Sequence, residues 1–215
     1  MKFPGSFSRV SVWLLGAAVM LAGAGCLGLF VPKHRVLVDA ISAPGVTKPN
    51  GKSYRLVAKK SVVTQTQVQV SVVKACVDAA LVTLGMFEPP PNVPPDLFIE
   101  VSYGNDMAGR TDPSGRETFL QLSARDNPGR SVDKATGAEL WDVRVAVMGI
   151  SGRLETAMPL LCAVAANHIA TDTHMESRID IPKNSPLVNS VRETAIKTLE
   201  GAPPPPGAPA ALPAK

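Results

Sequence analysis

Apolar and polar residues alternate with a period of two along three stretches in the middle of the chain. These stretches cover residues 97–103, 119–126 and 138–148. Such alternation is typical of strands with one buried and one wet face, so it predicts an antiparallel sheet. Two shorter apolar stretches, 36–40 and 53–58, predict two further strands. We therefore expect about five strands.

Apolar residues recur at steps of three and four in three other stretches, which predicts helices. The first covers residues 65–85, although its β-branched start leaves a strand as an alternative there. The second covers 154–170 and contains Pro159, which must lie in the first turn or kink the helix. The third begins after Ser185 as N-cap and ends at Gly201. The order of the elements predicts an α+β fold, in which two or three helices cover one face of the antiparallel sheet.

The chain begins with a segment typical of export. Lys2 and Arg9 precede an uncharged apolar run, residues 10–31, which contains Cys26. Three interpretations remain open. Small residues before Cys26 favour a lipoprotein signal, in which that cysteine becomes the first residue and carries acyl chains such as palmitate. Cleavage after Ala24 would instead release a secreted protein, and an uncut run is long enough to form a membrane anchor helix.

The sequence divides into three parts. Residues 1–31 are expected to be the signal peptide or membrane anchor, and residues 32–200 are expected to form a single α+β envelope domain. Within it, the Pro-rich stretch 88–95 predicts a stiff connector. The Pro/Ala-rich tail, residues 201–215, cannot bury a core and is expected to be disordered. All three interpretations of the leader place the domain outside the cytoplasm.

Composition and motifs argue against several kinds of function. The net charge is only +4 and aromatic residues make up 5% of the chain, without a basic stripe interleaved with aromatics. Nucleic acid is therefore not an expected partner. The histidines His34, His168 and His174 lie in no metal-binding motif, and Ser151 lacks the turn of a hydrolase nucleophile. We expect no enzyme, no cofactor and no metal site.

Beyond Cys26, the chain has Cys76 and Cys162, both within predicted helices. An oxidising compartment permits a disulfide between them. The alternative is a pair of free thiols that pack as small buried hydrophobic residues, which is common for cysteine. Both interpretations stay open.

One face of the predicted sheet is polar. Cross-strand ion pairing in water is favoured there over a docking surface for a protein or glycan. The alternation places Trp141 on the same face as Val143 and Val145, so it is expected in the core. Loop 104–118 is expected to be a mobile hairpin loop, because its charges lack the spacing of a calcium loop. The charged residues concerned are Glu100, Arg125, Asp142 and Arg144 on the face, and Asp106, Arg110, Asp112 and Arg116 in the loop.

Four segments of the domain resemble a bacterial envelope lipoprotein family of unknown function, domain-of-unknown-function family 4136. They are residues 53–56, 95–104, 139–145 and 151–154 leading to Pro159, and the resemblance covers about residues 36–195. It implies an envelope lipoprotein with an α+β domain and no catalytic residues to carry over. In lipoproteins that lack Asp directly after the modified cysteine, as with Leu27 here, sorting to the outer membrane is expected.

The expected function follows from location and architecture. We expect a membrane-tethered, periplasm-facing envelope lipoprotein with a non-catalytic domain, acting as a structural or accessory protein that binds an unknown envelope partner. The alternative is a binding module for an apolar or lipid-like ligand, as in auxiliary components of envelope lipid transport. An apolar cavity of several hundred Å³ beneath the helices would favour the ligand, whereas a filled core would favour the partner protein.

Overall fold

The computed structural model describes residues 32–59, 67–106, 117–148 and 154–201. Within these ranges, the residues from His34 onward belong to one compact unit, to which the following description applies. The predictions for the leader with Cys26, for most of loop 104–118 and for the tail beyond Gly201 lie outside the described residues. Among the helices within these ranges, none has both the length and the apolar character needed to cross a membrane.

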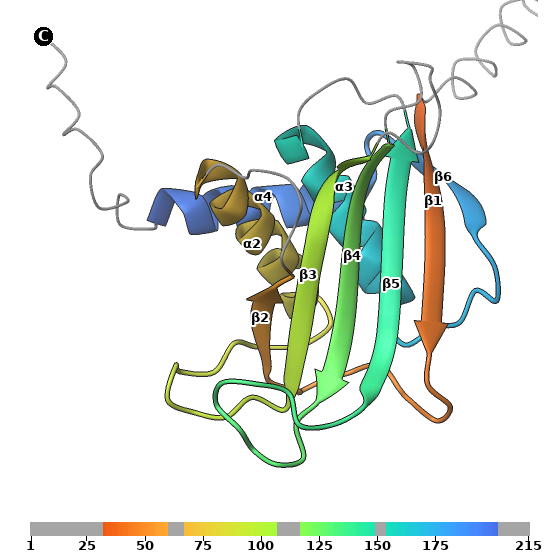
Figure 1. The fold of residues 1–215 in the computed structure, drawn as a ribbon. Helices are drawn as coiled ribbons and strands as arrows, with labels where there is room; N and C mark the ends of the chain where they lie inside the picture. Colours follow the sequence, from red (N-terminus) through yellow and green to blue (C-terminus); the bar gives the residue numbers. More distant parts are fainter. Residues whose placement is uncertain (1–31, 60–66, 107–116, 149–153, 202–215) are drawn as a thin grey trace, which may run out of the picture. The chain divides into compact units, whose positions relative to one another are not determined.

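In the described part of the chain, six strands form one sheet and three helices accompany it (Figure 1). The order of the strands across the sheet is β2-β3-β4-β5-β1-β6. Along the chain the elements are β1 (Lys33–Ser42), β2 (Tyr54–Ala58), α2 (Gln67–Val82), β3 (Leu97–Asp106), β4 (Glu117–Asp126), β5 (Glu139–Met148), α3 (Leu154–His168), β6 (Ser177–Pro182) and α4 (Pro186–Gly201).

The predicted α+β class is confirmed, with two differences. The sheet is mixed, because β2 pairs with β3 in parallel while β3, β4, β5 and β1 pair antiparallel in turn. Since α2 connects β2 to β3, the chain returns to the same end of the sheet before β3 begins, and parallel pairing follows. The second difference is β6, an edge strand that the sequence analysis did not predict.

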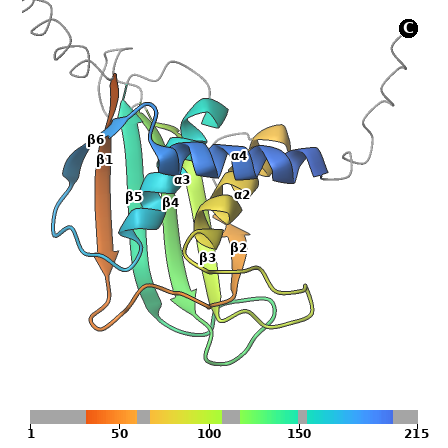
Figure 2. The same cartoon turned by 180° about the vertical axis from the view of Figure 1, so that it is seen from behind.

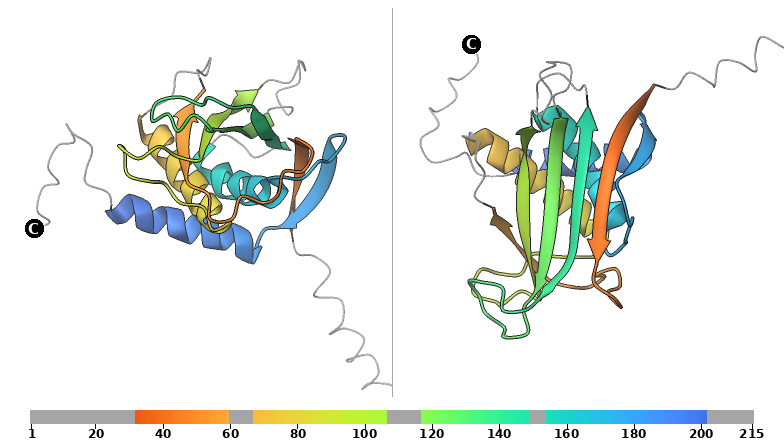
Figure 3. Two further views of the ribbon diagram at one scale, coloured as in Figure 1. Left: turned by 90° about the horizontal axis from the view of Figure 1, so that it is seen from below. Right: turned by 45° about the vertical axis from the view of Figure 1, so that its right-hand side comes forward.

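All three helices lie on the same face of the sheet, as the views in Figures 2 and 3 show. The strand register brings alternate residues of neighbouring strands onto that face, for example Val38 beside Val145 and Ala40 beside Val143. Both α2 and α3 pack against α4, and α3 also packs on β4 and β5. The period-two pattern therefore identified the buried face of the central strands correctly.

The ends of the helices agree with the sequence signals. Pro186 is the first residue of α4, and the C=O of Ser185 accepts the N–H of Asn189 at 3.1 Å. After α2, Gly85 adopts a φ of +74°, which L side chains rarely do, and so ends the helix. Pro159 lies past the first turn of α3 and is buried, so its ring replaces one helical N–H donor.

Candidate functional site

Side chains fill the space between the sheet and the helices. Trp141 and Leu122 from the sheet, and Met158 and Leu161 from α3, are all at most 1% exposed. They belong to one continuous cluster of buried residues that spans every strand from β1 to β5 and all three helices. The core of the described part is therefore filled, and the hollows that remain lie at its surface.

A mostly apolar hollow lies between β2, β3 and the first half of α2. Its volume is about 180 Å³. We call it the β2–α2 pocket. Aliphatic side chains make up most of its wall, and Lys74 stands at its rim. The lining residues are Leu56, Ala58, Val70, Val73, Lys74, Val77, Val101 and Tyr103.

A polar network fastens β2 to α2 beside this pocket. The hydroxyl of Tyr54 donates to Oδ1 of Asp78 at 2.8 Å, and Nζ of Lys74 donates to Oδ2 of Asp78 and to Oε2 of Glu88, both at 2.7 Å. Burial, together with the charge of Asp78, raises the pKa of Tyr54, so the hydroxyl remains a donor. Burial alone would lower the pKa of Lys74, but the hydrogen bonds that Lys74 donates to Asp78 and Glu88 raise it. The network fixes the position of α2 relative to β2.

A second polar cluster fixes the start of β2. Oδ2 of Asp96 accepts the backbone N–H of Ser53 at 2.9 Å and its hydroxyl at 2.7 Å. Oδ1 of Asp96 accepts from Nη1 of Arg130 at 3.1 Å. Hydrogen bonds from the backbone and hydroxyl of Ser53 hold the pKa of Asp96 below its usual 3.8. The Asp96 carboxylate, directly before β3, thus links the start of β3 to Ser53, directly before β2.

Replacing Asp96 by asparagine is expected to lower the free energy of unfolding by about 1–3 kcal/mol at neutral pH, because charge-assisted hydrogen bonds are lost. A carboxyl whose folded pKa is depressed stabilises the fold above its unfolded pKa and loses this contribution as pH falls through the folded pKa. The difference from wild type should therefore shrink below pH 3.8. Urea unfolding at neutral pH and at about pH 3 measures both effects.

Asp133→Asn is the matched control, since Asp133 is exposed in the same part of the molecule. It should change the free energy of unfolding by no more than about 0.5 kcal/mol. Equal effects of the two substitutions would show that the Ser53–Asp96 cluster does not stabilise the fold.

The outer edge of β2 is only partly covered. Ser53 forms a parallel bridge with Phe87, in which the N–H of Tyr54 donates to the C=O of Phe87 at 3.0 Å. Three prolines follow directly after Glu88, and Pro89 has no N–H with which to extend the bridge. The remainder of β2 therefore borders the β2–α2 pocket without a neighbouring strand on its outer side.

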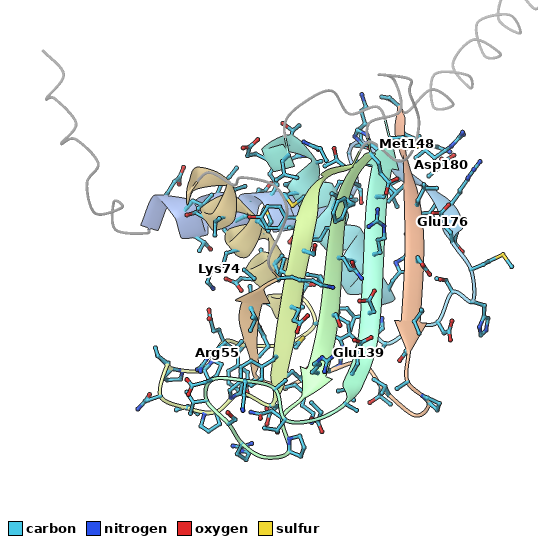
Figure 4. The ribbon with its side chains drawn as sticks, viewed as in Figure 1. Arg55, Lys74, Glu139, Met148, Glu176 and Asp180 are labelled. Carbon is cyan, nitrogen blue, oxygen red and sulfur yellow. The ribbon has the colours of Figure 1, made fainter. Side chains whose placement is uncertain are left out.

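Arg55 holds the loops below this edge, on the opposite face of β2 from the pocket (Figure 4). Its Nη1 donates to the C=O of Val132 at 2.6 Å, and its Nη2 donates to the C=O of Pro90 and of Val93, both at 3.1 Å. These bonds join the Pro-rich connector to the loop between β4 and β5. The Pro-rich connector is therefore held beside β2.

A larger open groove, of about 410 Å³, runs between the three helices. Cys76 lies in its wall, and burial raises the pKa of this thiol to about 11. Cys162 on α3 is fully buried, and burial also raises the pKa of its thiol. Both thiols are free in the structure. The helices that carry these cysteines, α2 and α3, pack against each other. A disulfide between Cys76 and Cys162 stays a prediction.

The face of the sheet away from the helices carries the predicted ion pairs. Arg144 contacts Oε1 of Glu117 at 2.9 Å and stacks over the ring of Phe119 at 4.4 Å, and Arg125 lies 3.9 Å from Glu139. These contacts confirm the prediction of cross-strand pairing.

The other charged residues predicted on this face do not gather into one constellation. Gln121 donates to Asp142 at 2.9 Å, and burial raises the pKa of Asp142. Glu100 is half-buried on β3.

The histidines lie apart from one another. His34 is at the start of β1, where burial lowers its pKa, and Nδ1 of His168 at the end of α3 contacts the C=O of Val164 at 2.9 Å. His174 pairs with Asp172 on the surface. In the described ranges, acidic, histidine and cysteine side chains do not form a cluster that could hold a metal ion.

Sequence reasoning missed the β2–α2 pocket. Leu56 and Ala58 alternate with Arg55 and Val57, which indicated a strand but not its place at an edge. The signal that could have found the edge is the proline run after Glu88, since proline cannot continue a ladder.

No protein-family model matches the chain, and no curated protein matches it. Among solved structures, the chain is similar to a PDZ domain protein from Parabacteroides distasonis, with 14% identity and a TM-score of 0.47. That similarity covers 82% of this chain but only 44% of the other protein, so the chain spans less than half of its length. A second similarity is to PelC, a dodecamer from Paraburkholderia phytofirmans, with 12% identity and a TM-score of 0.39, covering 64% of this chain and 99% of that one.

Proposed function

We propose that the chain is a membrane-tethered protein of the bacterial envelope whose α+β domain acts without catalysis, by binding another envelope protein. The leader supports the location, because a charged start, an apolar run and small residues before Cys26 are typical of an exported lipoprotein. The resemblance to the envelope lipoprotein family supports the same location. Of the alternative leaders, the lipidated form is the one proposed, with sorting to the outer membrane.

The filled core is the observation that carries the interaction role. Met158, Leu161 and Cys162 of α3 are completely buried, so the helices close tightly on the sheet. A ligand-carrying module of this architecture would need space beneath its helices, where side chains lie instead. Recognition is therefore assigned to the surface, where the β2–α2 pocket offers a mostly apolar hollow.

Intact mass spectrometry of the protein purified from membranes tests the tether. The expected result is a chain that begins at Cys26 and carries a diacyl group, which Cys26→Ser removes together with membrane association. A chain that begins at Gly25 without modification, or one that keeps the whole leader, would rule out lipid attachment.

Crosslinking in intact cells tests the interaction. It is expected to join the tethered chain reproducibly to one other envelope protein. Recovery of the chain only in unlinked form would contradict the interaction role.

The groove between the three helices favours a second candidate function, the binding of an apolar ligand. Its volume of about 410 Å³ falls within the roughly 300–1,000 Å³ of small-molecule sites. Val72, Ile196 and Leu199 contribute apolar walls, with Glu155 and Arg192 as polar groups. Saturable binding of a fluorescent fatty acid that Ile196→Arg abolishes would favour this function over the first.

A further inference from the structure

The hydrogen bonds of β2 define which of its backbone groups face β3. In a parallel pair, every second residue of a strand directs both its N–H and its C=O at the same neighbour. The C=O of Ser53 accepts the N–H of Leu97 at 3.0 Å, and the N–H of Lys59 donates to the C=O of Val101 at 3.0 Å. Odd-numbered residues of β2 therefore face β3, and even-numbered residues direct their backbone groups outward.

Among the residues that the structure describes, no backbone group pairs with the outward-facing groups of β2 beyond Tyr54. The N–H of Tyr54 donates to the C=O of Phe87. To continue the parallel pairing, the N–H of residue 89 would have to donate to the C=O of Tyr54. Pro89 has none, so the pairing stops. The C=O of Tyr54 and both backbone groups of Leu56 and Ala58 therefore face outward beyond the bridge.

The two edges of the sheet differ in how they are protected. At the far edge, Arg178 and Asp180 project from exposed positions of β6, and Pro182 ends it. Charges and proline are the usual means by which edge strands avoid pairing with other chains. The outer residues Leu56 and Ala58 of β2 carry neither. The β2 edge is thus the one that remains suited to pairing.

The β2–α2 pocket lies directly beside this open edge. Leu56 and Ala58 line it from the strand, and Val73 and Val77 line it from the helix. Its volume of about 180 Å³ is close to the roughly 150 Å³ of a cavity that holds benzene, so it accommodates one branched or aromatic side chain. A strand laid along β2 would place every second side chain on the side of this pocket.

We propose that the outer edge of β2 binds an extended segment of a partner protein as an added strand, with one apolar side chain of that segment in the β2–α2 pocket. This inference rests on the proposed function and names its partner: a proline-free segment in which apolar and polar residues alternate. Main-chain hydrogen bonds supply affinity in this mode of recognition, and the pocket supplies specificity.

The geometry favours such a segment over a second copy of the chain or a lipid. If two copies paired edge to edge through β2, Leu56 and Ala58 of each copy would line that copy's own pocket and would not enter the pocket of the other. A lipid would leave the outward N–H groups without acceptors along the edge.

The test uses the full chain in lipid nanodiscs and a phage-displayed library of random linear peptides. The expected result is enrichment of proline-free peptides with alternating apolar residues. Ala58→Pro removes an outward N–H without touching the β3 ladder, and edge strands tolerate proline. It should weaken binding of a synthetic enriched peptide at least tenfold, whereas Ala58→Ser, which keeps the N–H, should weaken it less than twofold.

Hydrogen exchange resolved to single amides provides a measurement that needs no variant. In the free protein the amides of Leu56 and Ala58 should exchange fast, while that of Lys59, bonded to Val101, is protected. The bound peptide should slow exchange at Leu56 and Ala58 at least tenfold.

Equal binding to both variants, no enriched linear peptide, or no protection at Leu56 and Ala58 would each overturn the proposal. So would a dimer in sedimentation that Ala58→Pro dissociates, since the edge would then bind a second copy. A lipidated chain that binds no peptide refutes this inference alone. A chain that is not tethered refutes the proposed function, whatever peptides it binds.

Discussion

Replacing Leu161 by alanine is expected to lower the free energy of unfolding by about 2–5 kcal/mol. Leu161 lies in the middle of α3 and is completely buried. Because α3 packs on β4 and β5 as well as on α2 and α4, the surrounding side chains are held from several sides and cannot collapse into the space. The loss is large against a typical total stability of about 5–15 kcal/mol.

Urea unfolding of the two proteins measures this difference, with the slope of the transition expected to stay the same. Ile196→Ala on α4 is the control, because Ile196 is 46% exposed and its removal leaves no enclosed cavity. The control should cost less than about 1 kcal/mol. If both substitutions had the same small effect, α3 would not be packed as the structure describes.

The central strands could be predicted because burial on one face alone dictates their pattern. In β5, Val143 and Val145 face the helices while Asp142 and Arg144 face the opposite side, and the sequence alternates accordingly. The ends of α4 were equally accessible, because Ser185 and Pro186 satisfy local rules for the start of a helix. Both kinds of signal reside within a few neighbouring residues.

The pairing of β2 and the existence of β6 could not be obtained in this way. The alternation in residues 53–58 predicts a strand but does not contain the identity or direction of its neighbour, which depends on the α2 crossover. In β6, Ile179 and Ile181 are only half-buried and alternate with charges over six residues. So short and weak a pattern is hard to distinguish from a loop.

The candidate site was out of reach of the sequence for a related reason. The Pro-rich connector was predicted to be stiff, and the structure shows a second effect of the same prolines at the edge of β2. An open edge is a property of two segments together, since the C=O of Tyr54 lacks a donor because Pro89 has no N–H. Periodicity describes one segment at a time and cannot reveal such a relation.

Trp141 is expected to be the most costly core residue to truncate, with Trp141→Ala lowering the free energy of unfolding by about 3–5 kcal/mol. The prediction that it lies in the core is confirmed, since it is 1% exposed. Its neighbours across the strands are the small residues Ala124 on β4 and Ser42 on β1, which make room for the indole ring. Alanine at position 141 would bring three small residues together and leave a cavity.

Trp141→Phe separates the contribution of the ring from that of its N–H. Nε1 is buried and finds no hydrogen-bond partner among the described residues. A buried donor without a partner costs about 1–3 kcal/mol, which phenylalanine avoids while it retains most of the apolar area. The substitution should therefore cost less than about 1.5 kcal/mol in urea unfolding. A cost equal to that of Trp141→Ala would instead mean that the indole N–H is hydrogen-bonded and stabilises the fold.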